Sequence, residues 1–155
     1  MGRRHLRRPE SVYQSGPLIY FVTACTRERI RVLARPRVAG VLRDALQVAG
    51  NQWGWLVGRY VVMPDHVHMF VTPGPPEGKS LSDFMREWKK WTSRRIASVF
   101  DVHRVWQREF FDHLLRTDES YDQKWEYVRS NPVRAGLCVS PDEWPYQGEI
   151  HILQL

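Results

Sequence analysis

The chain has 155 residues, of which 43% are hydrophobic and 26% charged, so it can form one packed domain with short tails. Lys and Arg number 23 against 17 Asp and Glu, which leaves a net charge of +6. This surplus favours a polyanionic partner, nucleic acid before an anionic membrane. The two cysteines, Cys25 and Cys138, lie far apart and outside any C-x-x-C pair. Their placement excludes a disulfide scaffold and a cysteine-rich zinc module.

The basic start of the chain is not followed by the apolar core of a secretory signal. The longest apolar stretch, Leu18 to Cys25, is too short to span a bilayer. We therefore expect a soluble, cytoplasmic protein with no membrane partner.

The first half of the chain predicts a strand, a helix and a second β-rich stretch. Leu18 to Cys25 is rich in β-branched and aromatic residues, which favours a strand. Apolar residues recur at intervals of three and four from Pro36 to Asn51, which predicts an amphipathic helix with the proline in its first turn. Trp55 to Thr72 is again β-rich, but Pro64 and Asp65 interrupt it. That interruption predicts either two strands around a turn or one strand with a bulge.

A Gly- and Pro-rich loop at residues 74–78 separates this stretch from a long helix. Ser80 and Asp83 resemble a capping box, and the helix that they open runs to about Val99. Residues 105–115 return to strand character.

A helix signal at residues 117–120 opens the last predicted helix. We expect this helix to end at Asn131, because the residue before Pro132 is pushed out of the α region. The resulting order of elements predicts an α+β sandwich of ferredoxin-like type. Its antiparallel sheet carries helices on one face, and the extra helix comes at the C-terminal end.

The sharpest local feature is the segment Asp65-His66-Val67-His68. Residues two apart on a strand face the same side of a sheet, so His66 and His68 project together while Val67 and Met69 face the opposite layer. Two neighbouring imidazoles can chelate one metal ion. The alternative is a pair of half-exposed strand histidines without a metal. A zinc hydrolase is disfavoured, because the residues after His68 supply no further ligand.

Tyr127 and Asn131 are four residues apart on the predicted last helix, so they share a face. A tyrosine hydroxyl can act as a covalent nucleophile, and an Asn carbonyl oxygen can bind a hard cation. The alternatives are a core-facing aromatic residue and a C-cap before proline. Tyr121 is the rival nucleophile, but it faces roughly the opposite side and Trp125 stands where a ligand would be needed.

Three segments together resemble a known family. They are Tyr60-Val-Val-Met-Pro-Asp-His-Val-His68, Trp106-Gln-Arg-Glu-Phe-Phe-Asp-His113 and Tyr127-Val-Arg-Ser-Asn-Pro-Val-Arg-Ala-Gly-Leu137. In this order they resemble the HUH single-tyrosine transposases of the insertion-sequence-200/605 type, and most closely the REP-associated branch. The resemblance covers most of the chain, from about Tyr20 to Trp144.

The resemblance implies a ferredoxin-like α+β fold and an enzyme that cuts and rejoins single-stranded, hairpin-bearing DNA through a 5′-phosphotyrosine, with Mg²⁺ or Mn²⁺. It implies His66, His68 and Asn131 as the metal ligands and Tyr127 as the nucleophile. The hairpins expected as substrate lie in palindromic repeats. A domesticated relative that binds DNA hairpins without cutting them is the alternative function.

The family resemblance also frames the domain organisation. Residues 16–137 are expected to form the catalytic domain, residues 1–15 a basic tail and residues 138–155 a C-terminal extension. Insertion-sequence members act as dimers that exchange tyrosine helices, whereas the REP-associated branch can act as a monomer. The long extension favours a monomer, because it can cover the surface that a partner would use.

Basic residues predict where DNA would bind. The residues that we expect to contact it are Arg86, Lys89, Lys90, Arg94 and Arg95 on the long helix, and Arg134 near the proposed site. The alternative is a solvated face that only keeps the protein soluble. The tail adds Arg3, Arg4, Arg7 and Arg8. Asp65 and His113 are candidates for orienting the metal ligands from behind.

Overall fold

The computed structural model describes residues 18–76, 78–116 and 120–153. Within them, one antiparallel sheet has the strand order β4-β1-β3-β2-β5. The strands are β1 (Tyr20–Cys25), β2 (Trp55–Met63), β3 (His66–Pro73), β4 (Phe111–Leu114) and β5 (Gln147–Glu149). The basic tail predicted at residues 1–15, with its four arginines, lies outside the described residues.

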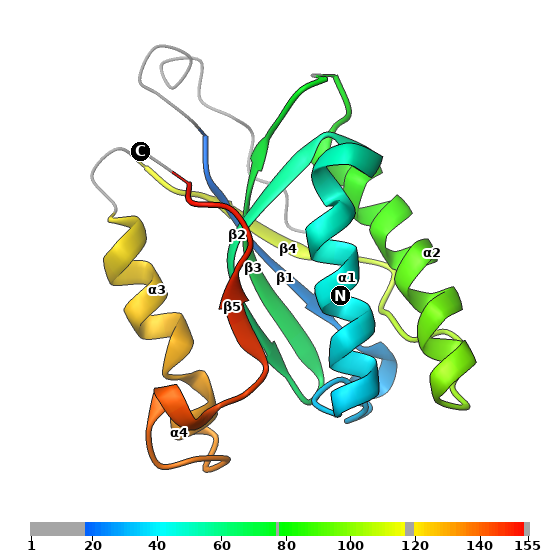
Figure 1. The fold of residues 1–155 in the computed structure, drawn as a ribbon, viewed down its shortest axis with the longest axis vertical. Helices are drawn as coiled ribbons and strands as arrows, with labels where there is room; N and C mark the ends of the chain where they lie inside the picture. Colours follow the sequence, from blue (N-terminus) through cyan, green and yellow to red (C-terminus); the bar gives the residue numbers. More distant parts are fainter. Residues whose placement is uncertain (1–17, 77, 117–119, 154–155) are drawn as a thin grey trace.

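Helices cover both faces of this sheet (Figure 1). Helices α1 (Pro36–Trp53) and α2 (Leu81–Val99) pack against one face and enclose the larger core. Helix α3 (Tyr121–Arg129) covers the opposite face, where a smaller apolar cluster lies beneath it. The predicted ferredoxin-like α+β class is therefore confirmed, with the helix that carries Tyr127 on its own side of the sheet. In the part of the chain described, no helix has both the length and the apolar character needed to cross a membrane.

The β-rich stretch from residue 55 to residue 73 forms two strands around a tight turn. Met63 pairs with His66, so Pro64 and Asp65 alone connect β2 to β3. A register shift between Val57 and Tyr60 adds a bulge to β2. Of the two alternatives that the interruption at Pro64 left open, the structure has the two strands around a turn, and the bulge in β2 lies elsewhere.

The last predicted helix is wrong in one detail: Tyr127 and Asn131 do not lie on one continuous helix. Helix α3 ends at Arg129, and a short helix α4 (Asn131–Arg134) begins after Ser130. Pro132 lacks a backbone N–H, so it cannot continue α3, but it fits the first turn of a new helix. Asn131 thus opens α4 rather than ending α3.

Strand character at residues 105–115 is also shorter than predicted, because only Phe111–Leu114 forms a strand. Trp106 makes one isolated bridge to Thr26. The residues after Trp106 are held by a side chain instead of a strand. The Lys89 ammonium group donates to the carbonyl oxygens of Gln107 at 2.8 Å, Arg108 at 3.2 Å and Glu109 at 2.7 Å. A lysine thus satisfies carbonyl groups that a neighbouring strand would otherwise bind.

The C-terminal segment, for which the sequence predicted no element, completes the sheet. Strand β5 pairs with the edge of β2, and the Val62 N–H donates to the Tyr146 carbonyl oxygen at 2.7 Å. The Trp144 indole N–H donates to the Val62 carbonyl oxygen at 2.9 Å. The edge of β2 is therefore occupied by the protein's own chain.

Candidate active site

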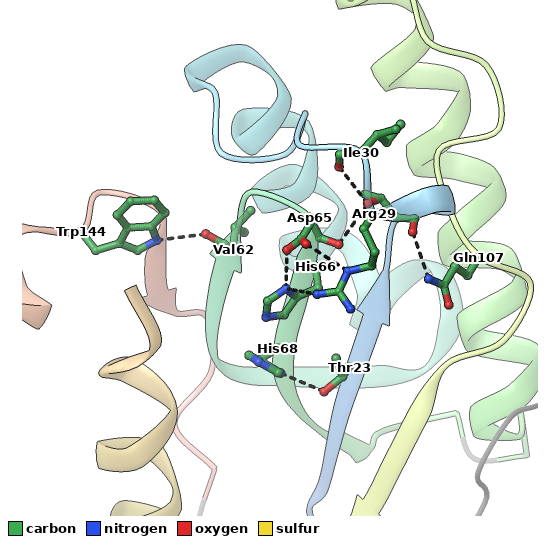
Figure 2. Close-up of polar contacts among 10 residues, drawn as sticks. Thr23, Arg29, Ile30, Val62, Asp65, His66, His68, Gln107 and Trp144 are labelled. Carbon is green, nitrogen blue, oxygen red and sulfur yellow. Dashed lines mark hydrogen bonds and ion pairs between the residues drawn. The ribbon is translucent and has the colours of Figure 1, made fainter. Parts of the chain in front are cut away.

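The two histidines of the H-x-H motif lie side by side at the start of β3 (Figure 2). Their ring centroids are 4.7 Å apart. Val67 and Met69 are fully buried in the core under α1 and α2, whereas Phe70 belongs to the cluster on the α3 side. Strand alternation therefore places His66 and His68 on the sheet face that α3 covers, as the sequence predicted.

Each imidazole is held through its Nδ1 atom. The Nδ1 atom of His66 lies 2.7 Å from the Asp65 carboxylate, and that of His68 lies 2.8 Å from the Thr23 hydroxyl oxygen (Figure 2). Among the described residues, neither Nε2 atom has a hydrogen-bond partner. Metal-binding histidines typically have this arrangement, with one nitrogen oriented by a polar group and the other left for the metal.

Arg29 is a member of this cluster that the sequence did not reveal. Its Nε atom donates to the Asp65 carboxylate at 3.0 Å, and its Nη2 atom lies 3.4 Å from Nδ1 of His66. Burial alone would raise the pKa of the Asp65 carboxyl, but hydrogen bonds from Arg29 and His66 outweigh it, so the pKa lies below its usual range. Asp65 is therefore an ionised carboxylate placed to orient His66.

The turn that carries Asp65 is fixed by contacts to Thr26, the residue that follows β1. Both the backbone N–H and the hydroxyl of Thr26 donate to the Asp65 carbonyl oxygen, at 2.9 and 3.1 Å. The Gln107 side-chain amide donates in turn to the Thr26 carbonyl oxygen at 3.2 Å. The histidine pair is thus linked through Thr26 to the segment that follows α2.

Both imidazoles are neutral at pH 7. Burial lowers the pKa of His66, although Asp65 partly opposes this shift. Burial also lowers the pKa of His68, to about 3, and the positive charges of Lys124 and Arg134 act in the same direction. Neutral imidazole is the form that binds a metal ion.

Tyr127 lies on α3 with 65% of its surface exposed. The Arg134 guanidinium sits over its ring, 4.1 Å from the ring centroid. Arg134 also donates through Nη2 to the Tyr127 carbonyl oxygen at 2.8 Å and to the Asn131 side-chain oxygen. One guanidinium group therefore holds together the two residues that the break after Arg129 separates.

Helix α3 approaches the histidines through Phe21. The Lys124 ammonium lies 5.0 Å from the centroid of the Phe21 ring, and that ring stacks on His68 at 5.1 Å. Figure 2 shows α3 running beside the histidine pair. Residues from β3, α3 and α4 thus gather on one face of the sheet.

Tyr121, the rival nucleophile, is buried in the fold. Its hydroxyl oxygen accepts a hydrogen bond from the Arg59 backbone N–H at 2.9 Å, beside the bulge in β2. Burial raises its pKa to about 12. Tyr121 therefore docks α3 onto the sheet, while Tyr127 is the tyrosine of this helix that is exposed to solvent.

The donor set does not form the closed four-ligand shell of a structural zinc site. Among the described residues, no group of three His, Cys, Asp or Glu is arranged to hold a metal. A cation here would take the Nε2 atoms of His66 and His68 and the Asn131 amide oxygen, which Arg134 would have to release. Such a set leaves open positions for water and phosphate oxygens.

The predicted DNA-contacting residues of the long helix lie away from the histidine pair. Helix α2, which carries the five predicted DNA-contacting residues, packs on the opposite face of the sheet from α3. His113 lies on β4, opposite Phe21 in the register with β1. The structure thus joins Asp65 to His66 and leaves the basic helix as a separate surface.

Comparisons with known proteins identify the family of this chain. The family model for IS200-like transposases matches residues 15–131. The chain belongs to the IS200-like transposase family. Among its relatives, a REP-associated tyrosine transposase of Escherichia coli K12 is 26% identical over 106 residues, which cover 68% of this chain and 61% of that protein. The family that the sequence segments resembled is confirmed.

Two solved structures share the fold of this IS200-like chain. A REP-associated tyrosine transposase bound to a REP hairpin has a TM-score of 0.69 at 24% identity, covering 93% of this chain and 81% of that one. A candidate transposase of Deinococcus radiodurans R1 has a TM-score of 0.56 at 23% identity, covering 81% and 97%. These likenesses establish the architecture.

The depressed pKa of His68 predicts acid sensitivity in metal-free buffer. An unfolded histidine binds its proton near pH ~6.5, whereas folded His68 does so only near pH 3. Acid therefore favours the unfolded chain between these values, and stability falls as the pH drops. Denaturant titrations would measure the free energy of unfolding at about pH 7 and about pH 5. This free energy should fall less between the two pH values for His68→Asn than for the wild type. His103→Asn, at an exposed position, is the control; equal losses in wild type and His68→Asn would contradict the prediction.

Proposed function

We propose that this protein is a divalent-metal-dependent endonuclease and strand transferase that acts on single-stranded, hairpin-bearing DNA with Tyr127 as nucleophile. The observation that carries the proposal is the pair of neutral histidines with open Nε2 atoms, on the sheet face where Tyr127 and Asn131 also lie. Membership of the IS200-like transposase family supports a DNA strand-transfer reaction. The relative bound to a REP hairpin supports DNA hairpins in palindromic repeats as the substrate.

His66, His68 and Asn131 would hold Mg²⁺ or Mn²⁺, which when bound polarises the scissile phosphate as a Lewis acid. Asp65 and Thr23 keep the two imidazole rings turned towards that position. The orienting contacts use the Nδ1 atoms, so the Nε2 atoms stay available to bind the metal ion.

The Tyr127 hydroxyl oxygen attacks the phosphorus atom, and the bond from phosphorus to the 3′ oxygen breaks. The phenol loses one proton, and the departing 3′ oxygen gains one. The product is a 5′-phosphotyrosine, which keeps a phosphoester bond, so a 3′-hydroxyl can attack it and reseal the strand without ATP. Arg134, over the Tyr127 ring, places a positive charge beside the phosphate that joins this residue.

Covalent trapping tests this function. Labelled single-stranded hairpin DNA with Mn²⁺ should form a protein–DNA adduct that resists denaturation with the wild type and not with Tyr127→Phe. His66→Ala should reduce the adduct by at least about a hundredfold, because the metal ligand is lost. Tyr146→Phe, on the C-terminal segment, is the matched control and should react normally. An adduct that survives in Tyr127→Phe would refute the assignment, whereas tight binding without any adduct would favour the non-catalytic hairpin binder.

We further propose that the protein acts as a monomer with its tyrosine in cis. Arg59 on β2 contacts Asp122 of α3 at 2.6 Å and Glu149 of β5 at 3.4 Å. At the other end of α3, Arg129 pairs with Asp142 of the C-terminal segment. In the described chain these contacts are all made within one copy, and β5 already occupies the edge of β2, so the fold is complete without a helix from a second chain.

Complementation tests the cis arrangement. A mixture of a His66→Ala/His68→Ala variant with Tyr127→Phe should form no adduct, because neither chain carries a whole site. The mass in solution should be close to the chain mass of 18.4 kDa. Recovery of the adduct in the mixture, or twice that mass, would show instead that two chains share a site.

A further inference from the structure

Lys124 lies on α3 between the proposed nucleophile and the histidine pair. It precedes Tyr127 by three residues, and residues three apart on a helix are neighbours on its surface. Its side chain is half-buried, and its ammonium group lies 5.0 Å from the centroid of the Phe21 ring. That ring stacks in turn on His68, with 5.1 Å between the centroids. The attraction between an ammonium group and an aromatic ring thus holds the Lys124 charge next to the candidate site.

The acidic residues of α3 are paired with other cations. Asp122 contacts Arg59 at 2.6 Å, and Glu126 contacts Arg129 at 3.2 Å. Within residues 18–76, 78–116 and 120–153, no carboxylate forms a salt bridge with Lys124. The positive charge of Lys124 is therefore not neutralised by the helix that carries it.

Positive charge gathers around His68. Burial is the main reason that the pKa of His68 lies low, but the positive charges of Lys124, Arg134 and Arg29 also lower it. Because electrostatic effects weaken with distance, all three cations lie close to this imidazole. They come from α3, α4 and the turn after β1, so tertiary structure alone brings them together.

Like charges that gather beside a buried ring favour an anion that binds among them. The candidate metal ligands are two neutral imidazoles and one neutral amide, so they add no negative charge. In phosphoryl transfer, negative charge is spread over the phosphate oxygens in the transition state. An ammonium group donates charge-assisted hydrogen bonds to such oxygens.

We propose that Lys124 is a catalytic residue of this site, whose ammonium group binds a non-bridging oxygen of the scissile phosphate and stabilises the charge that develops while Tyr127 attacks. This role rests on the proposed function. Lys124 neither gives nor takes a proton in it, so the bonds that form and break are those of the attack by Tyr127.

The rate of adduct formation at saturating hairpin DNA and Mn²⁺ tests this role. Lys124→Met keeps an unbranched chain over Phe21 and removes the charge, whereas Lys124→Arg retains the charge. The matched control is Lys79→Met, which makes the same substitution at an exposed position between β3 and α2. Thermal unfolding would verify that all three variants fold.

Lys124→Met should lower this rate at least about tenfold, because the site loses a group that binds the transition state. Lys124→Arg should keep most of the rate, and Lys79→Met should react like the wild type. A wild-type rate in Lys124→Met would overturn the proposal. So would an equal loss in Lys79→Met, because net charge alone would then explain the effect.

A substrate with less charge separates a phosphate contact from a packing role. A methylphosphonate at the cleavage site has a methyl group in place of one non-bridging oxygen, so it lacks the negative charge that Lys124 would stabilise. With this substrate, the rate defect of Lys124→Met relative to the wild type should shrink at least about fivefold. A defect of the same size on both substrates would show that Lys124 only positions α3, and would overturn the proposal.

The proposed function and the role of Lys124 fail in different ways. Absence of any adduct with the wild type would refute the endonuclease, and the role of Lys124 with it. An adduct on Tyr127 that forms equally fast in the wild type and in Lys124→Met would leave the endonuclease standing and refute the role of Lys124 alone.

Discussion

The register of β3 is the constraint on which the candidate site depends. Cys25 and Thr23 of β1 lie opposite His66 and His68, and Met63 of β2 lies opposite His66 from the other side. A slip of one residue would turn both imidazoles into the core under α1 and α2 and expose Val67 to the other face. The burial of Val67 and Met69 therefore stabilises the orientation of the histidines as well as the fold.

The second half of the site reaches this face through contacts that are distant in sequence. Tyr121 docks the start of α3 on the bulge of β2, and the Arg59 side chain holds both α3 and β5. The exposed ion pairs add little stability individually. Their value lies in geometry, since they determine where Tyr127 stands relative to β3. The C-terminal strand thus supports the helix that carries the proposed nucleophile.

Local patterns were sufficient to predict the ferredoxin-like class and the shared face of His66 and His68, because a strand alternates with a period of two. They were insufficient for Arg29 and Thr23, whose contacts with Asp65 and His68 arise only from tertiary pairing over 36 and 45 residues. The break after Arg129 was missed because Pro132 can end one helix or begin another. The roles of His66, His68, Tyr127 and Asn131 in chemistry stay predictions that experiment must test.

The most direct test of the account is to identify the residue that carries the DNA. After reaction with Mn²⁺ and nuclease trimming, trypsin would release Tyr121 and Tyr127 on separate peptides, residues 117–124 and 125–129. Mass spectrometry should find the nucleotide on residues 125–129, attached to Tyr127. A nucleotide on residues 117–124, or on any other peptide, would contradict the account.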